Sequence, residues 1–135
     1  MTMKLVADFP PNIELIRQHF TLSGNEIFTY GDTVYNPTGE QLPPWLKAHE
    51  AVHIKQQQDV DPGVWWDRYL HEPDFRLEME LPAHQVEYAI FYRHCPVRNV
   101  RRAYLKTMAR RLSGPIYGHM ISYAEAMKKI RGKGK

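Results

Sequence analysis

LKAHEAVHIKQQQ, residues 46–58, is the stretch that decides how the chain is interpreted. It places His49 and His53 four residues apart, with Glu50 directly after the first histidine. Residues four apart share one face of an α-helix, so both imidazoles can bind one ion, at about 2.0–2.1 Å for zinc. Glu50 lies about 100° further round the helix, where it can reach a water molecule beside the metal. The pattern predicts a helix over about 45–58 that carries a zinc site.

The residues around the two histidines predict that this helix is largely buried. They are the apolar residues Ala48, Ala51, Val52 and Ile54. Buried histidines need partners for their ring nitrogens, which favours a metal site. The alternative is a partly exposed helix whose two histidines are unrelated. The three glutamines at 56–58 are interpreted as a solvated helix end.

A catalytic zinc ion also needs a third protein ligand and a position left open for water. LEMELPAHQVEY, residues 77–88, supplies the candidates. They are Glu78, Glu80, His84 and Glu87. Glu80 is favoured because Ala83, one turn later, is small enough to let two helices approach closely. Glu87 and then His84 are the alternatives.

The rest of the chain predicts an α+β fold that is mostly α. Apolar spacing and turn residues predict further helices at about 12–20, 63–71, 74–94, 97–112 and 121–130, with a β-hairpin or two short strands within 26–37. Asp61 is a candidate N-cap. Pro82 either bends the helix over 74–94 or splits it in two. We therefore expect one domain over 1–135, with about five to six helices, a small sheet and a short flexible basic tail at about 131–135.

Composition and charge narrow the class of protein. The chain has 135 residues, of which 43% are hydrophobic and 24% charged, as in ordinary globular domains. No apolar run approaches the roughly 18 residues of a membrane helix, and no signal peptide is recognisable at the N-terminus. The single cysteine excludes an internal disulfide framework and fits a reducing compartment. We expect a cytoplasmic location.

Charge is distributed unevenly along the chain. Residues 1–93 hold 7 Lys/Arg and 14 Asp/Glu and sum to −7, whereas residues 94–135 hold 11 Lys/Arg and one acid and sum to +10. The predicted helix over 97–112 is basic and amphipathic. Its apolar stripe is expected at Val97, Val100, Tyr104, Met108 and Leu112. Its Arg98, Arg101, Arg102, Lys106, Arg110 and Arg111 either form a solvated face or follow phosphates weakly and without sequence preference.

HEAVH followed by ELPA resembles the gluzincin zinc metallopeptidases, which combine HExxH with a glutamate from a later helix. YGDTVYNPTGEQLPPWLKAHEAVHIKQQ, GVWWDRYL, PDFRLEMELPAHQVEY and SGPIYG resemble short proteins of metallopeptidase type encoded by bacteriophages. The resemblance covers about Tyr30 to Ala126. It implies a zincin-like domain with a small sheet beside the HExxH helix, and a location in the host cytoplasm.

For the site, the resemblance implies Zn²⁺ held by His49, His53 and Glu80, with Glu50 as general base. Two positions depart from the family pattern: His84 stands where gluzincins often have an acid, and Pro82 interrupts the helix.

The expected function is a zinc-dependent peptidase acting on peptides or proteins. Zinc would lower the pKa of water, and Glu50 would accept its proton. Tyr117 is the first candidate for a donor to the carbonyl oxygen, with His119 and Tyr123 next. Trp65, Trp66 and Tyr69 either pack the core or line a cleft.

Two alternatives stay open. One is a binding protein that uses the zinc scaffold only structurally. The other is a DNA-associated protease that uses the basic helix. No membrane partner is expected, and the oligomeric state is left open.

Overall fold

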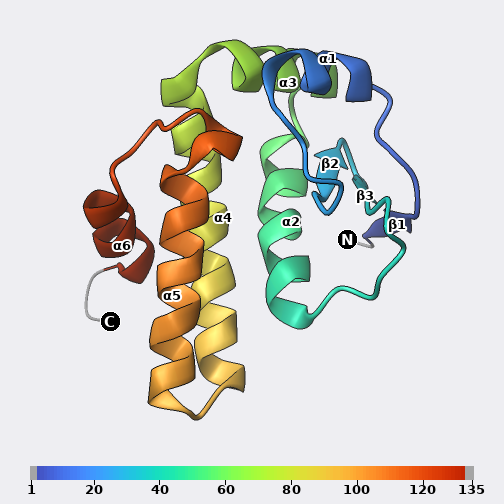
Figure 1. The fold of residues 1–135 in the computed structure, drawn as a ribbon. Helices are drawn as coiled ribbons and strands as arrows, with labels where there is room; N and C mark the ends of the chain where they lie inside the picture. Colours follow the sequence, from blue (N-terminus) through green and yellow to red (C-terminus); the bar gives the residue numbers. More distant parts are fainter. Residues whose placement is uncertain (1–2, 133–135) are drawn as a thin grey trace.

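The computed structural model describes residues 3–132, and Figure 1 shows that they form an α+β fold that is mostly helical. The described helices are α1 (Ile13–His19), α2 (Pro44–Gln56), α3 (Pro62–His71), α4 (Pro73–His94), α5 (Arg98–Ser113), α6 (Tyr123–Arg131) and the 3₁₀ turn η1 (Pro115–Tyr117). The strands are β1 (Lys4–Val6), β2 (Phe28–Tyr30) and β3 (Thr33–Tyr35). The expected class, with its six helices and small sheet, is confirmed.

Local sequence explains where most helices begin. Proline stands in the first turn of α2, α3 and α4, where its missing N–H has no helical partner to lose. Asp61 caps α3 by accepting a hydrogen bond from the Gly63 amide, as predicted. Ser122 caps α6 in the same way, through the Glu125 amide. The predicted helix bounds therefore hold to within a few residues.

Helix α4 runs through Pro82 as one 22-residue helix, so of the two expected alternatives, a bend or a split, the split is excluded. Pro82 is exposed. The carbonyl group that loses its helical partner there can therefore bond to water, which lowers the cost of the proline. The continuous helix carries Glu80, Ala83, His84 and Glu87 along one buried side.

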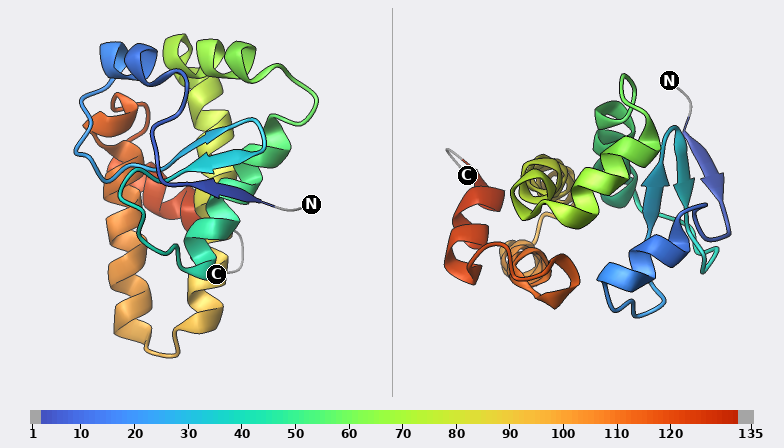
Figure 2. Two further views of the ribbon diagram at one scale, coloured as in Figure 1. Left: turned by 90° about the vertical axis from the view of Figure 1, so that its right-hand side faces the viewer. Right: turned by 90° about the horizontal axis from the view of Figure 1, so that it is seen from above.

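The sheet has the order β1-β3-β2. β2 and β3 form the expected hairpin, with Gly31 in the turn at φ 66°, a conformation that favours glycine. β1 pairs in parallel with β3 and was not predicted. Its three residues are exposed and form too short a run to give a strand pattern. Figure 2 shows the sheet beside α2 on the side away from α4 and α5.

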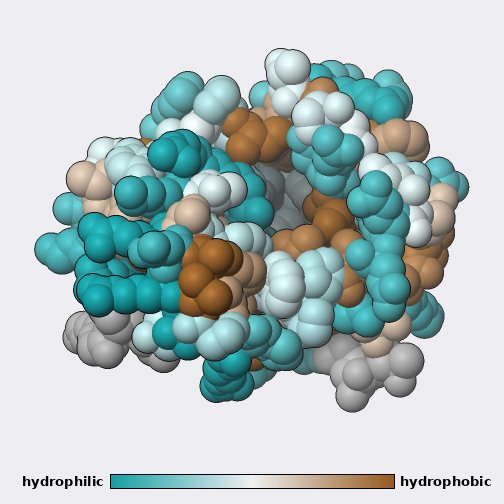
Figure 3. Space-filling model, turned by 60° about the horizontal axis from the view of Figure 1, so that its bottom comes forward, coloured by the Kyte–Doolittle hydropathy of each residue, from teal (hydrophilic) through white to brown (hydrophobic). Residues whose placement is uncertain are grey.

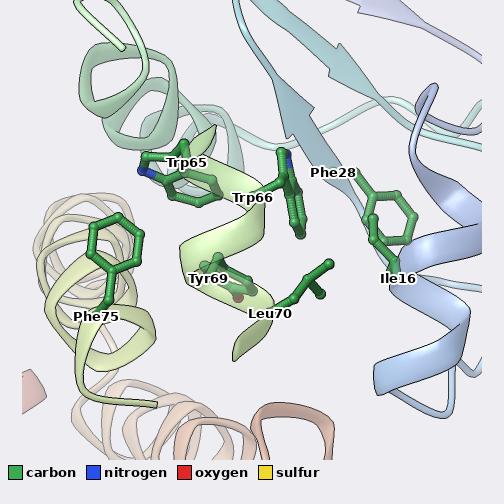
Figure 4. Packing of buried hydrophobic residues seen from close by; sticks show 7 residues of the cluster. All are labelled: Ile16, Phe28, Trp65, Trp66, Tyr69, Leu70 and Phe75. Atoms are coloured by element: carbon green, nitrogen blue, oxygen red, sulfur yellow. The ribbon is translucent and has the colours of Figure 1, made fainter. Parts of the chain in front are cut away.

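Two apolar clusters flank the site. Figure 4 shows the first, in which α3 packs toward α1, β2 and the start of α4. Its buried members are Ile16, Phe28, Trp65, Trp66, Tyr69, Leu70 and Phe75. The second cluster joins α4, α5 and α6 through residues such as Met108 and Leu112. The apolar stripe predicted for α5 is wrong at its start, because Val97 and Val100 are exposed; Leu105 and Ala109 are buried in their place.

The C-terminal part is described only as far as Gly132. Arg131 ends α6, so the predicted tail does not include Arg131, and residues 133–135 of that prediction lie outside the described residues. Between residues 3 and 132, no helix combines the length and apolar content that crossing a membrane requires.

Candidate metal centre

Helix α2 turns His49, Glu50 and His53 into the interior of the protein. All three residues are buried, with exposed fractions of 4–6%. The helix as a whole is less buried than predicted, because Ala51 is exposed and Val52 is half-buried. The helix therefore turns three ionisable side chains inward, and buried groups of this kind need partners.

Glu80 of α4 completes a group with the two histidines. One side-chain ligand atom from each of His49, His53 and Glu80 lies within 4.8 Å of the others. The Nε2 atom of His49 is 3.4 Å from Glu80 Oε1, and the Nε2 atom of His53 is 3.3 Å from Glu80 Oε2. Ala83 is fully buried and α4 packs against α2, which agrees with a small residue at this position.

The chemistry of this donor set fits a zinc ion. Two imidazole nitrogens and a carboxylate are common zinc ligands, and two ligands at about 2.0–2.1 Å on a tetrahedral ion lie about 3.3–3.4 Å apart. The two nitrogen–oxygen separations are close to that value, one to each oxygen of Glu80. Glu80 Oε1 is in addition buried without a hydrogen-bond partner. A buried carboxylate oxygen without a partner is costly, and a cation would stabilise it.

The far nitrogens of both histidines have partners that fix the rings. His49 Nδ1 lies 2.7 Å from Glu87 Oε1, and His53 Nδ1 lies 2.9 Å from Gln56 Oε1. These oxygens accept, so each Nδ1 donates; in the neutral form of each ring, Nε2 then carries a lone pair on the side of Glu80. Gln56 is itself held by a bond to the Met79 carbonyl group. Ligand histidines in metal sites characteristically have such partners.

The electrostatics of the group favour a positive charge at its centre. Burial opposes an imidazolium at His49, but neighbouring carboxylates outweigh it and raise its pKa to about 10. They belong to Glu50, Glu80 and Glu87. Burial also works against a charged Glu80, yet His53 and His49 hold the pKa of this carboxyl well below its usual range. Glu80 is therefore an anion between two histidine nitrogens.

Neither alternative third ligand is free to take that role. Glu87 is occupied by His49, by Arg111 Nη2 at 2.7 Å and by the Tyr104 hydroxyl at 2.5 Å. His84 donates from Nδ1 to the Glu80 carbonyl group and accepts at Nε2 from Arg111. Burial and the charge of Arg111 lower the pKa of His84 to about 3, so its ring is neutral. The fourth sequence candidate, Glu78, is exposed.

Replacing Arg111 by methionine is expected to reduce the free energy of unfolding by about 1–3 kcal/mol, because buried Glu87 would lose a charged partner. The Arg111 side chain is 34% exposed, so water screens part of the pair. Urea denaturation would measure the change. Arg110→Met is the matched control, since Arg110 is exposed, and we expect about 0.5 kcal/mol or less. Equal losses in both variants would contradict a special role for Arg111.

Glu50 lies beside the group without belonging to it. Its Oε1 accepts a hydrogen bond from Thr29 Oγ1 at 2.9 Å, and its Oε2 lies 3.9 Å from His49 Nε2. Burial raises the pKa of Glu50, against the opposing effect of the two histidines. One oxygen is thus anchored to β2, and the other faces the space next to the ligand nitrogens.

Two adjoining cavities give access to this space. A small one of about 90 Å³ is lined by His49, His53 and Glu80 together with Glu50. A larger one of about 820 Å³ shares His49, Glu50 and Tyr117 with it, a size within the range of about 300–1,000 Å³ typical of ligand sites. Figure 3 shows a hollow on one face of the molecule, with hydrophobic residues along part of its rim.

Of the three donors suggested by the sequence, only Tyr117 is brought to the cavities. Arg76 holds it there by donating from Nη1 to the Tyr117 carbonyl group, at 2.9 Å. The structure does not bring His119 to the site, because this residue is exposed in a left-handed turn with Nδ1 on the Ser113 carbonyl group. Tyr123 is also exposed, at the start of α6.

Sequence reasoning missed several polar residues of the site. The Tyr69 hydroxyl donates to Glu80 Oε2 at 2.5 Å. Tyr69 thus both packs in the core and lines the small cavity, as do Trp65 and Trp66. Gln57 is buried and links the Gly31 amide to the Thr29 carbonyl group, so the prediction of a solvated helix end is wrong at Gln56 and Gln57. The one available signal was the run of three glutamines that follows the motif after two intervening residues.

No family model, curated protein or solved structure matches this chain.

Proposed function

We propose that the protein is a zinc-dependent peptidase of the gluzincin type, with His49, His53 and Glu80 as zinc ligands. The observation that carries the proposal is the convergence of two histidine Nε2 atoms on a buried carboxylate whose Oε1 atom has no hydrogen-bond partner. The resemblance of HEAVH and ELPA to gluzincin motifs supports the same three residues.

A bound zinc ion supplies Lewis acidity, polarising a carbonyl group and lowering the pKa of water to near 7 in the best cases. Glu50 accepts the proton of the attacking water at Oε2, while the bond from Thr29 holds Oε1. Because burial raises the pKa of Glu50, its carboxylate is a stronger base than an exposed glutamate. Glu50 then passes the proton to the leaving amine.

Tyr117 is assigned as donor to the substrate carbonyl oxygen, which becomes negative during attack. It lines both cavities, and its phenol pKa is raised well above the ordinary value by burial and by the charge of Glu80. The hydroxyl therefore keeps its proton. Tyr69 has a different role, since its hydroxyl is committed to Glu80 Oε2 and orients that ligand.

The second candidate is a binding protein in which zinc is structural. The small size of the inner cavity, about 90 Å³, favours this reading, because it leaves little room for a substrate beside the ligands. A DNA-associated protease has less support. Arg111 binds Glu87. Arg101 donates to the Cys95 carbonyl group and lies over the Tyr92 ring. Fewer arginines of α5 are therefore available to bind phosphates than its sequence suggests.

The test is metal content together with hydrolysis. Untagged protein purified without chelator is expected to hold about one zinc per chain and to cleave casein or members of a mixed peptide library. Removing the metal with a chelator should abolish cleavage, and added zinc should restore it. Zinc-loaded protein that cleaves none of these substrates would favour the binding protein with structural zinc. Protein that takes up no zinc would exclude both the peptidase and that binding protein.

A further inference from the structure

A second pair of histidines lies outside the site described above, at the ends of α1 and α3. The Nε2 atoms of His19 and His71 are 3.3 Å apart, and their rings meet edge to face at 4.7 Å between centroids. Both side chains are exposed. The residues are 52 positions apart in sequence, so the fold and not local helix geometry brings them together.

The hydrogen bonds at the far nitrogens decide how the rings face each other. His19 Nδ1 lies 3.0 Å from the Leu15 carbonyl oxygen, and His71 Nδ1 lies 2.8 Å from the Asp67 carbonyl oxygen. A carbonyl oxygen can only accept, so both Nδ1 atoms carry hydrogen. In the neutral rings both Nε2 atoms then hold lone pairs, and two lone pairs directed at each other at 3.3 Å repel. A cation between the two Nε2 atoms would remove the repulsion.

The separation suits a metal ion. Two nitrogen ligands at about 2.0–2.1 Å on a tetrahedral ion lie about 3.3–3.4 Å apart. We propose that His19 and His71 form a second site for a divalent transition-metal ion such as Zn²⁺ or Cu²⁺, the ions that imidazole ligands suit. Water completes the coordination. The Asp67 carboxylate, 3.3 Å from His71 Nδ1, supports the ring from behind.

The proposed second site lies where the ends of α1 and α3 meet. Figures 1 and 2 show α1 and α3 together at one end of the molecule, and His19 also lines the larger cavity. An ion held there ties the end of α1 to the end of α3 at the edge of that cavity. With only two protein ligands, the site binds more weakly than the buried centre, which has three.

The proposal is independent of peptidase activity and of the buried centre, so it is tested by metal uptake alone. Full-length untagged protein, stripped of metal, is dialysed to equilibrium against increasing ZnCl₂ or CuCl₂ near neutral pH, and bound metal is measured by elemental analysis. His19→Ala and His71→Ala are each expected to bind one ion fewer than the unmodified chain at saturation. Cu²⁺ should occupy the site at lower concentration than Zn²⁺.

His94→Ala is the matched control, because His94 is also exposed near a helix end with Nδ1 on a carbonyl group four residues earlier, but has no partner histidine in the part of the chain that the structure describes. It should bind as many ions as the unmodified chain. His49→Ala should keep the ion that His19→Ala loses, whether or not the buried centre binds zinc. If His19→Ala and His71→Ala bind as many ions as the unmodified chain, the proposal is overturned and a shared proton explains the contact.

Discussion

Glu50→Gln is expected to keep its zinc and to lose peptide hydrolysis by a factor of about 10² to 10⁴, the usual contribution of a general base. Glutamine has the size of glutamate, and its carbonyl oxygen can still accept the hydrogen bond from Thr29. It cannot take a proton from water. Because Glu50 is not among the three proposed ligands, the substitution changes proton transfer and leaves the metal-binding atoms in place.

The measurement is zinc content and initial hydrolysis rate for the unmodified chain, Glu50→Gln and Glu78→Gln. Glu78 lies on the exposed side of α4, so Glu78→Gln makes the same chemical change away from the site and should behave as the unmodified chain. Full activity in Glu50→Gln would refute the proposed mechanism. Loss of zinc from Glu50→Gln would mean that Glu50 contributes to metal binding.

The part of the site that could be predicted from sequence is the part that local geometry determines. A four-residue spacing places His49 and His53 on one helical face wherever the helix lies. The preference for Glu80 came from Ala83, one turn away, whose small side chain permits close contact with α2. The structure agrees, since Ala83 is fully buried and Glu80 lies beside both histidines.

The groups that orient the proposed ligands could not be predicted, because their contacts join distant segments. Glu87 meets His49 across 38 positions, and Arg111 meets Glu87 across 24. The sequence offers Glu87 as a possible ligand, and only the packing of α2, α4 and α5 shows that it pairs with a histidine nitrogen. Strand β1 could not be predicted either, because its three exposed residues give no strand pattern and its partner β3 lies far along the chain.

Glu80→Ala should lower zinc affinity more than any other carboxylate substitution in the centre. The change removes one of three proposed ligands and the negative charge between two nitrogen atoms. Glu87→Gln should have a smaller effect, about 10- to 100-fold, which is typical for a group that orients a ligand without touching the metal. Activity should fall in Glu80→Ala as a consequence of zinc loss and recover partly in excess zinc.

Which of the two variants, Glu80→Ala or Glu87→Gln, loses more zinc affinity decides between the candidate third ligands. Zinc affinity is measured by competition with a chromogenic chelator, with Glu78→Gln as the unchanged control and circular dichroism to verify folding. A greater loss in Glu87→Gln than in Glu80→Ala would move the third ligand to Glu87, and undiminished affinity in both would point to His84. Neither outcome would contradict the proposed role of Glu50 as general base. Its position next to His49 Nε2 does not depend on which residue of α4 is the third ligand.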